Sequence, residues 1–362
     1  MAELTATRML EWRRNSQKLY ANEFRMSKYG AIQLYLDAAR RNALVDSDVR
    51  REALGSTGNT IKIQVMKDNA TAQVGTERSC TPVNNRTDSA LVPVTFTSLT
   101  DGFTMYPNEY DNNDVKYQQH FEANMISMTK RLLKKLDQLA LANLEANKTQ
   151  VLPNTLGYAF GSNKTVAATW DDRMDLLGDL NAMLAGMNFD GDIRMVGNMG
   201  IMSLLNKLAE HGKYNDVNKA MEYMDKEFFA TNQLSESGTF GALYAVAGNQ
   251  VDILSRVSRA EYHGSRADNH IFGTTTLPML EGLTFGTHFI ESVGDQSTPT
   301  GNGDMICDIK HEYGFAVDIA FVNAYESDAA TNGTGILKAT IANGLRGVQT
   351  VAPAAGSKWP NS

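Results

Sequence analysis

The feature that most constrains the fold is a helical pattern that runs from about Asp114 to Asn147. Neither glycine nor proline interrupts it, and Asp114 is a suitable N-cap residue. At about 1.5 Å per residue, roughly 33 residues form a helix about 50 Å long, which exceeds the diameter of a small domain. We therefore predict a helix that supports other parts of the chain, and the absence of strict heptads argues against a coiled coil. Apolar side chains recur along it at spacings of three to five, at Tyr117, Phe121, Met125, Met128, Leu132, Leu136, Leu139 and Leu144.

Two segments with the alternating pattern of strands precede this helix and predict a long β-hairpin. Their apolar positions are Ile61, Ile63 and Val65 in the first segment and Val92, Val94 and Phe96 in the second. Pro93 places the second at a sheet edge, because proline cannot donate to a strand ladder. The polar residues 66–90 join the two, and an isolated two-stranded hairpin is at best marginally stable in water. We expect the hairpin to lie across a neighbouring subunit, with a disordered insertion as the alternative.

The segments before and after these elements differ in their patterns of apolar residues. Residues 1–55 are helical in pattern, but their apolar spacing is irregular, so we interpret them as an arm and not as a core helix. From Thr169 the chain alternates between helix and strand, with a helix start at 169–172, a short strand at 193–196 and a helix capped by Asn198. The last third returns to strands, the clearest of which are 315–321 and 336–341.

Charge and composition restrict the classes of protein further. The first 55 residues hold ten lysine or arginine residues against seven aspartate or glutamate residues, a net charge of +3, although the whole chain carries −7. This segment is either a solvated helix face or an arm that faces nucleic acid or an acidic partner. With only Cys80 and Cys307, and with no apolar run typical of a signal peptide or a membrane span, we expect a reducing cytoplasm and no membrane.

The sequence contains no recognisable catalytic or metal-binding motif. None of the six histidines forms a zinc-type pair, and the two cysteines are too far apart for a zinc site. Residues 161–165 vaguely suggest a phosphate loop but lack its Gly-Lys-Ser/Thr triplet, so we interpret them as a turn. We therefore predict that the protein is not an enzyme and uses no cofactor or metal.

The serial order of these parts resembles a known family. An arm, an extended two-stranded loop, a very long helix, an α/β unit and a final β-rich region follow one another, as in the major capsid proteins of tailed bacteriophages of the Hong Kong 97 type, whose fold encapsulins share. Local likeness is best at IRMVGN (193–198), LLNKL (204–208) and GKY (212–214). These segments resemble the strand, the asparagine-containing turn and the leucine-rich helix of the domain near the capsomer centre in that family.

The resemblance implies an α+β, HK97-like capsid fold with defined parts. They are an N-terminal arm (1–57), an extended β-hairpin loop (58–110), the spine helix with the first part of a β-rich peripheral domain (111–169), an axial α/β domain (170–275), the return to the peripheral domain (276–350) and a C-terminal tail (351–362).

The function implied by the resemblance is structural. Copies of the chain would assemble as pentamers and hexamers into an icosahedral shell around double-stranded DNA, made in the host cytoplasm and found in the virion. Scaffold, portal and decoration proteins are further expected partners. We expect subunit contacts through Lys67, Arg78 and Arg86, and interior or DNA-facing positions for Arg13, Arg14 and Lys18. An encapsulin-type bacterial shell is the alternative, and an enzyme with an unrecognised site is a third hypothesis.

Overall fold

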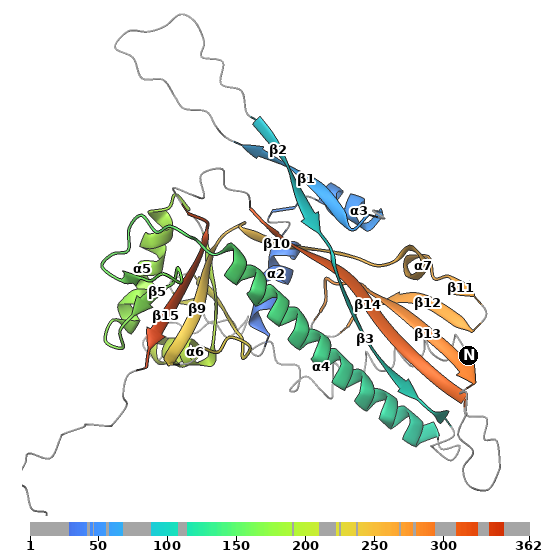
Figure 1. Cartoon of the computed structure of the whole chain (residues 1–362). Coiled ribbons are helices and arrows are strands. Elements are labelled where there is room, and N and C mark those ends of the chain that lie inside the picture. The colour runs from blue at the N-terminus through green and yellow to red at the C-terminus, as the bar shows by residue number, and fades with distance from the viewer. Residues whose placement is uncertain are drawn as a thin grey trace, which may run out of the picture.

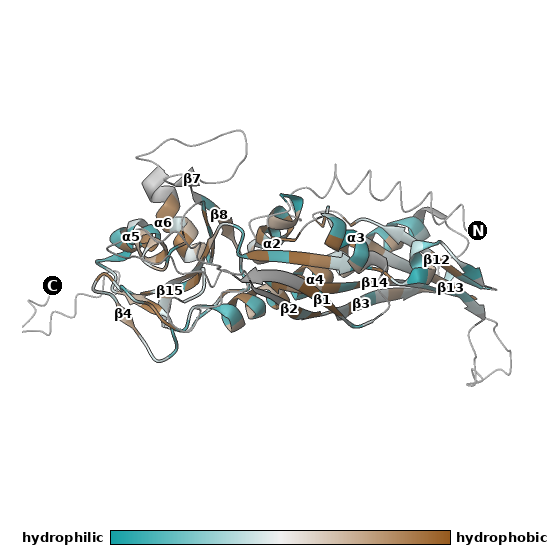
Figure 2. Ribbon diagram, turned by 90° about the horizontal axis from the view of Figure 1, so that it is seen from above, coloured by the Kyte–Doolittle hydropathy of each residue, from teal (hydrophilic) through white to brown (hydrophobic). Residues whose placement is uncertain are grey.

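The computed structural model describes residues 29–41, 44–45, 47–55, 58–67, 88–107, 114–189, 192–209, 222–223, 226–236, 238–267, 269–277, 280–293, 309–324 and 333–343. They form a long, thin body, with α5, α6 and β15 at one end and β12 and β13 at the other (Figures 1 and 2). The helices are α2 (Gly30–Arg40), α3 (Ser47–Gly55), α4 (Asp114–Asn147), α5 (Arg173–Ala185), α6 (Met199–Ala209) and α7 (Arg259–Tyr262).

The spine helix is present as predicted. Helix α4 spans 34 residues, and its apolar stripe is buried along the length of the helix, with Leu139 partly buried. It crosses most of the body in Figure 1 and packs against strands of both sheets. One continuous core therefore joins the two ends of the molecule.

A six-stranded antiparallel sheet forms one end of the body. Its strand order is β10-β14-β13-β12-β11, with β3 paired to β14 as well. Strands β13 and β10 follow one another along one edge of β14, and β3 runs along the other edge. The strands are β3 (Thr97–Met105), β10 (Val251–Arg256), β11 (Arg266–Ala267), β12 (His270–Thr275), β13 (Phe285–Val293) and β14 (Ile309–Asn323).

A seven-stranded mixed sheet forms the other end. Its order is β4-β5-β15-β9-β6-β8-β7, in which β5 with β15 and β6 with β8 are parallel. Helices α5 and α6 pack their leucines against this sheet in a second core. The strands are β4 (Ala159–Phe160), β5 (Val166–Ala168), β6 (Ile193–Gly197), β7 (Glu222–Tyr223), β8 (Lys226–Ala230), β9 (Thr239–Ala247) and β15 (Ile336–Ala342).

The membership of strands in the two sheets does not follow the predicted boundaries between segments of the chain. Strands β10 to β12 fall within the predicted axial segment 170–275 but belong to the six-stranded sheet. Strand β15, expected in the return segment 276–350, belongs to the seven-stranded sheet, and β3, expected in the loop 58–110, pairs with β14. Alternation of apolar residues identifies a strand but not its partners, because pairing is set by contacts distant in sequence.

The interpretation of residues 30–40 as part of an arm outside the core is wrong. Helix α2 is buried over most of its surface against α4, β10 and β8, and its polar side chains form only a narrow stripe at Gln33, Asp37 and Arg40. Its N-terminus is capped by another helix, since Asp137 of α4 accepts a hydrogen bond from Ile32 N at 3.0 Å and one from Thr231 Oγ1 at 2.5 Å. Burial raises the pKa of this Asp137 carboxyl, although these hydrogen bonds oppose the shift. A Cβ at Gly30 would lie 2.5 Å from Ala230 O, so the close approach of α2 to β8 requires glycine there.

Candidate functional site

The predicted β-hairpin is present and stands apart from both large sheets. Strands β1 (Thr60–Lys67) and β2 (Asp88–Thr95) form a two-stranded antiparallel sheet, in register from Thr60 opposite Thr95 to Lys67 opposite Asp88. In Figure 1 the pair projects from the body on the side opposite α4. Among the described residues, those beneath its base are therefore the ones that can stabilise it.

One face of the hairpin base is packed on the body. Val94 and Phe96 are buried, and Ile61 and Ile63 pack beside them. Their partners are side chains of the short helix α3 and of strands β10 and β14, namely Val49, Ala53, Leu254, Ala320 and Val322. This small apolar cluster compensates for the marginal stability expected of an isolated hairpin.

The described side chains on the opposite face of the hairpin are exposed. Leu91, directly opposite Gln64, is a large apolar side chain that retains 62% of its accessible surface. Lys62 and Pro93 lie opposite each other on the same face and are also exposed. These side chains, which lie far from the core, are accessible to contacts outside the subunit.

A buried arginine holds the neck of the hairpin, where the chain enters and leaves it. Arg256, at the end of β10, donates to Gly58 O at 2.5 Å and to Asn59 Oδ1 at 3.4 Å. It also donates from Nε to Asp318 Oδ2 of β14 at 3.1 Å, and its guanidinium lies 4.3 Å from the ring centre of Phe96. The Phe96 amide closes the neck by donating to Asn59 O at 2.9 Å. One guanidinium thus contacts both chain segments of the neck and the underlying sheet.

A second arginine holds α3 beneath the hairpin. Arg50 donates to both carboxylate oxygens of the fully buried Asp252, at 2.6 and 2.5 Å, and to Ile253 O at 2.8 Å. Asp252 also accepts from the backbone amides of Val45 and Ile253. The buried charge is therefore paired and hydrogen-bonded, as a buried charge must be to avoid a large desolvation cost.

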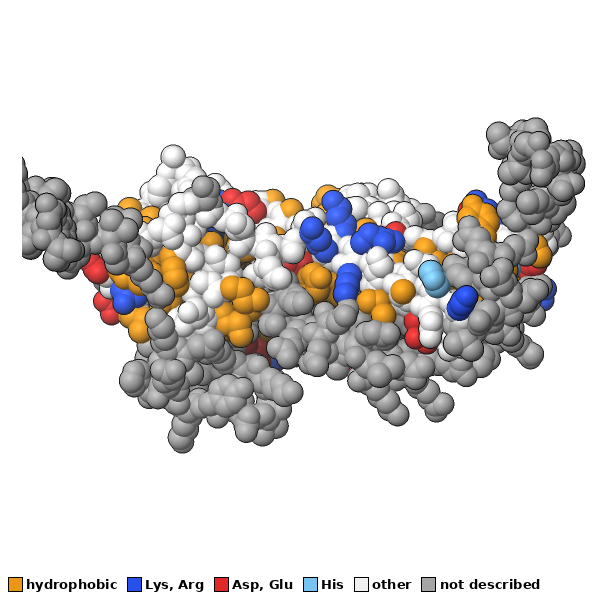
Figure 3. Space-filling view, turned by 90° about the horizontal axis from the view of Figure 1, so that it is seen from below, with side chains coloured by type: hydrophobic (Ala, Val, Ile, Leu, Met, Phe, Trp, Pro, Cys, Tyr) orange, Lys and Arg blue, Asp and Glu red, His pale blue; other side chains and the backbone are white. Residues whose placement is uncertain are grey.

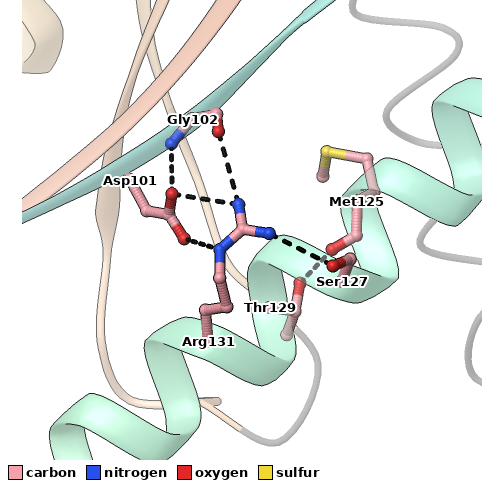
Figure 4. Close-up of polar contacts among 6 residues, drawn as sticks. All are labelled: Asp101, Gly102, Met125, Ser127, Thr129 and Arg131. Atoms are coloured by element: carbon pink, nitrogen blue, oxygen red, sulfur yellow. Dashed lines mark hydrogen bonds and ion pairs between the residues drawn. The ribbon is translucent and has the colours of Figure 1, made fainter.

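The side of the molecule on which α4 lies carries a group of basic side chains. Figure 3 shows lysine and arginine side chains gathered in the middle of this face, and the exposed side chains of α4 include Arg131, Lys134 and Lys135. Arg131 forms a bidentate pair with Asp101 of β3, at 2.8 and 3.0 Å, and also donates to Ser127 Oγ (Figure 4). This pair links the exposed side of the helix to the six-stranded sheet.

The C-terminal end of α4 is held to the other sheet by a polar cluster around Glu145. Its carboxylate accepts hydrogen bonds from Lys148 Nζ at 2.6 Å and Tyr244 Oη at 2.5 Å, and forms an ion pair with Lys338 at 3.1 Å. Partial burial acts to raise the pKa of Glu145, but the hydrogen bonds from these three partners outweigh it and lower the pKa to about 2. Glu236 completes the cluster through an ion pair with Lys338.

The predicted contact residues fall mostly outside the part of the chain that the structure describes. Lys67 ends β1 opposite Asp88, but its side chain is not described. Arg78 and Arg86 of the loop, and Arg13, Arg14 and Lys18 of the arm, lie outside the described residues, so their roles remain predictions. Sequence reasoning missed Arg256; the available signal was a charged residue at the end of an apolar strand, which must be paired when buried.

Within the described ranges, no group of three or more histidine, cysteine, aspartate or glutamate side chains could hold a metal ion. His270 and His288, from neighbouring strands, share a hydrogen bond of 2.8 Å, and burial followed by the charge of His270 lowers the pKa of His288. Residues 161–165 form the predicted turn between β4 and β5. No helix among the described residues is long and apolar enough to cross a membrane.

Two opposite sides of a thin body carry a projecting hairpin and a long helix with an exposed polar face (Figure 1).

No family model matches the sequence, and no curated protein matches it. Solved structures do match the fold. One from Mycobacterium phage Che8 is 11% identical, with a TM-score of 0.48, over 83% of this chain and 89% of that chain. The capsid structure of cyanophage P-SCSP1u is 10% identical, with a TM-score of 0.42, over 80% of this chain and 85% of that one. The capsid of Ralstonia phage GP4 is 8% identical, with a TM-score of 0.43, over 80% and 86%.

Proposed function

We propose that this chain is the major capsid protein of a tailed bacteriophage. Copies of it assemble as pentamers and hexamers into an icosahedral shell that encloses double-stranded DNA. The observation that carries the proposal is the hairpin of β1 and β2, which is anchored at its base, exposed on its outer face and directed away from the body. A subunit that worked alone would gain nothing from such a projection.

The placement of the hairpin favours rings over symmetric dimers. The hairpin and α4 lie on opposite sides of the body, so a hairpin that contacts the α4 side of the next copy makes a head-to-tail contact. Head-to-tail contacts generate closed rings when the rotation between copies is a whole fraction of a turn. Pentamers and hexamers are such rings.

Many weak contacts are enough to hold the assembly together. Each copy would touch several neighbours, so the effective concentration of each further contact is high once the first has formed. The exposed leucine on the hairpin supplies apolar area, and the basic side chains on α4 supply charge. The protein is proposed to be a structural component of the virion, assembled in the host cytoplasm, and not an enzyme.

The remaining partners belong to the same proposal. Lys67, Arg78 and Arg86 are proposed to contact a neighbouring subunit, and Arg13, Arg14 and Lys18 to face DNA or a scaffold protein. Portal and decoration proteins complete the expected set. An encapsulin-type shell would share the fold, and the nature of the enclosed material, DNA or protein cargo, separates the two.

The test uses the loop between the two strands. In the variant, residues 68–87 are replaced by Asn-Gly, a two-residue turn that suits a hairpin. Negative-stain microscopy of the expressed wild-type chain should show shells, sheets or capsomers, whereas the variant should remain soluble and folded without closed shells. Normal shells from the variant, or a compact monomer from the wild type at all concentrations, would overturn the proposal.

A charge test addresses the arm. Replacing Arg13, Arg14 and Lys18 together by glutamate should lower the nucleic-acid content of the particles or prevent their assembly, because phosphate contacts depend on positive charge. Unchanged assembly and unchanged genome content would remove these residues from the proposal.

A further inference from the structure

The neck of the hairpin is held by several contacts to one side chain, that of Arg256. Arg256 is 7% exposed, and its Nη1 donates to Gly58 O, its Nη2 to Asn59 Oδ1 and its Nε to Asp318 Oδ2. The central carbon of the guanidinium lies over the ring of Phe96, 4.3 Å from the ring centre. Gly58 and Asn59 precede β1, and Phe96 follows β2, so the contacts include both chain segments that connect the hairpin to the body.

The chemistry of arginine suits this position. A guanidinium is planar and presents its N–H groups in a fixed fork, so simultaneous bonds in different directions fix the relative positions of the bonded groups. Here one part of the fork bonds the neck, and the Nε side bonds Asp318 of β14. A lysine at this position would keep the charge but would bond through a single flexible ammonium group.

A small rotation at the neck would move the far end of the hairpin a long way. Eight residues per strand, at about 3.3 Å per residue, make a lever of roughly 26 Å. A tilt of about 10° at the base would therefore displace its end by about 4 to 5 Å, which is comparable to the spacing between neighbouring strands. A contact surface displaced by that amount no longer meets the same side chains of a partner.

We propose that Arg256 is a positioning residue that sets the direction in which the hairpin projects, and thereby the angle at which copies of the chain join. This inference rests on the proposed function. Head-to-tail contacts form closed rings only when the rotation between copies is a whole fraction of a turn. Other rotations generate open or helical assemblies. Loss of the guanidinium fork should therefore alter the shape of the assembly more than the stability of the subunit.

The chain offers a matched control for a substitution at this site. Arg194 of β6 is 8% exposed and forms ion pairs with Asp37 and Glu227, at 3.3 Å each, but it lies in the seven-stranded sheet. Arg194→Lys therefore removes a buried, ion-paired guanidinium far from the hairpin. Asp318→Asn provides a second variant at the neck, since it weakens the other side of the same arrangement without changing its shape.

The direct experiment measures the direction of the hairpin in the unassembled subunit. Spin labels at Leu91→Cys, on the hairpin, and Tyr262→Cys, on the body, report one distance, after Cys80 and Cys307 are replaced by serine; both labelled side chains are exposed. Pulsed electron resonance should give a narrow distance distribution for the otherwise wild-type chain and for Arg194→Lys. It should give a broadened or shifted distribution for Arg256→Lys and, to a smaller extent, for Asp318→Asn.

Microscopy of the unlabelled variants gives the second readout. Arg256→Lys should lose closed shells of wild-type diameter in favour of open sheets or particles of mixed size, while Arg194→Lys keeps the wild-type diameter. Wild-type shells and an unchanged distance distribution from Arg256→Lys would overturn the inference. Equal loss of shells from both arginine variants would also overturn it, because the effect would then reflect subunit stability. If wild-type chains formed no shells or capsomers, that result would instead contradict the proposed function.

Discussion

The hairpin of β1 and β2 and the spine helix α4 are both long, but they are held in opposite ways. The helix buries its apolar stripe in a core shared by both sheets, and polar clusters at Arg131 and Glu145 link it to one sheet each. Within the described part of the chain, the hairpin is packed at its base, where Val94 and Phe96 are buried, and its outer face leaves Leu91 exposed. The helix therefore serves the stability of the subunit, and the hairpin is available for contacts with other copies.

The largest expected effect comes from opening a cavity in the core beneath the helix. Leu136 of α4 is fully buried, so Leu136→Ala removes apolar contacts that neighbouring side chains only partly replace. The free energy of unfolding should fall by about 2 to 5 kcal/mol, measured by urea denaturation of the unassembled subunit. A loss as small as that of a surface substitution would contradict the assignment of α4 to the core.

Acid should weaken the attachment of α4 to the seven-stranded sheet. The pKa of Glu145 is lowered from its ordinary value of 4.5 to about 2, so the folded state favours the carboxylate. This contribution to stability is present above pH 4.5 and is lost as the pH falls toward 2. Glu145→Gln should therefore be less stable than the wild type at neutral pH, and the difference should shrink across this range. A difference that does not change with pH would contradict the role given to the charge.

The ion pair between α4 and β3 should contribute less. Arg131 is about half exposed, and its pairing with Asp101 is screened by water and salt. Arg131→Lys loses the bidentate geometry and should lower the free energy of unfolding by about 0.2 to 1 kcal/mol. The measurement is denaturation at low and high salt, with a smaller difference between the two proteins expected at high salt. A larger loss would show that the exposed side of the helix matters more to the fold than its burial indicates.

We expect the smallest change in subunit stability from a substitution on the hairpin itself. Leu91→Ala should change the free energy of unfolding by no more than about 0.5 kcal/mol, because the side chain is exposed. The same substitution should raise the protein concentration needed for assembly, which light scattering measures. Lys62→Ala, on the same exposed face, is a matched control for a side chain of different chemistry. If Leu91→Ala destabilised the subunit as Leu136→Ala does, the contrast between hairpin and helix would be lost.

Local periodicity predicted the elements of both regions. The stripe from Tyr117 to Leu144 predicted α4 with its observed ends, and the alternation around Ile61 and Val92 predicted β1 and β2. Such patterns are readable because the side chains of a helix or strand repeat at a fixed period, whatever surrounds them. Helix α2 escaped the same reasoning because its apolar residues cover most of its surface, so that the polar stripe of Gln33, Asp37 and Arg40 is narrow.

The sequence by itself determined the spine helix, the two strands of the hairpin and several other elements, and that a long polar loop precedes a helix too long for a small domain. Only the tertiary structure decided which sheet each strand joins, that α2 lies in the core and that Arg256 holds the neck of the hairpin. The physical reason is distance along the chain. Arg256 and Gly58 are 198 positions apart, and β10 pairs with β14 although β11, β12 and β13 lie between them in the sequence. Contacts of that kind depend on the packing of the whole body and leave no periodic signal in the sequence.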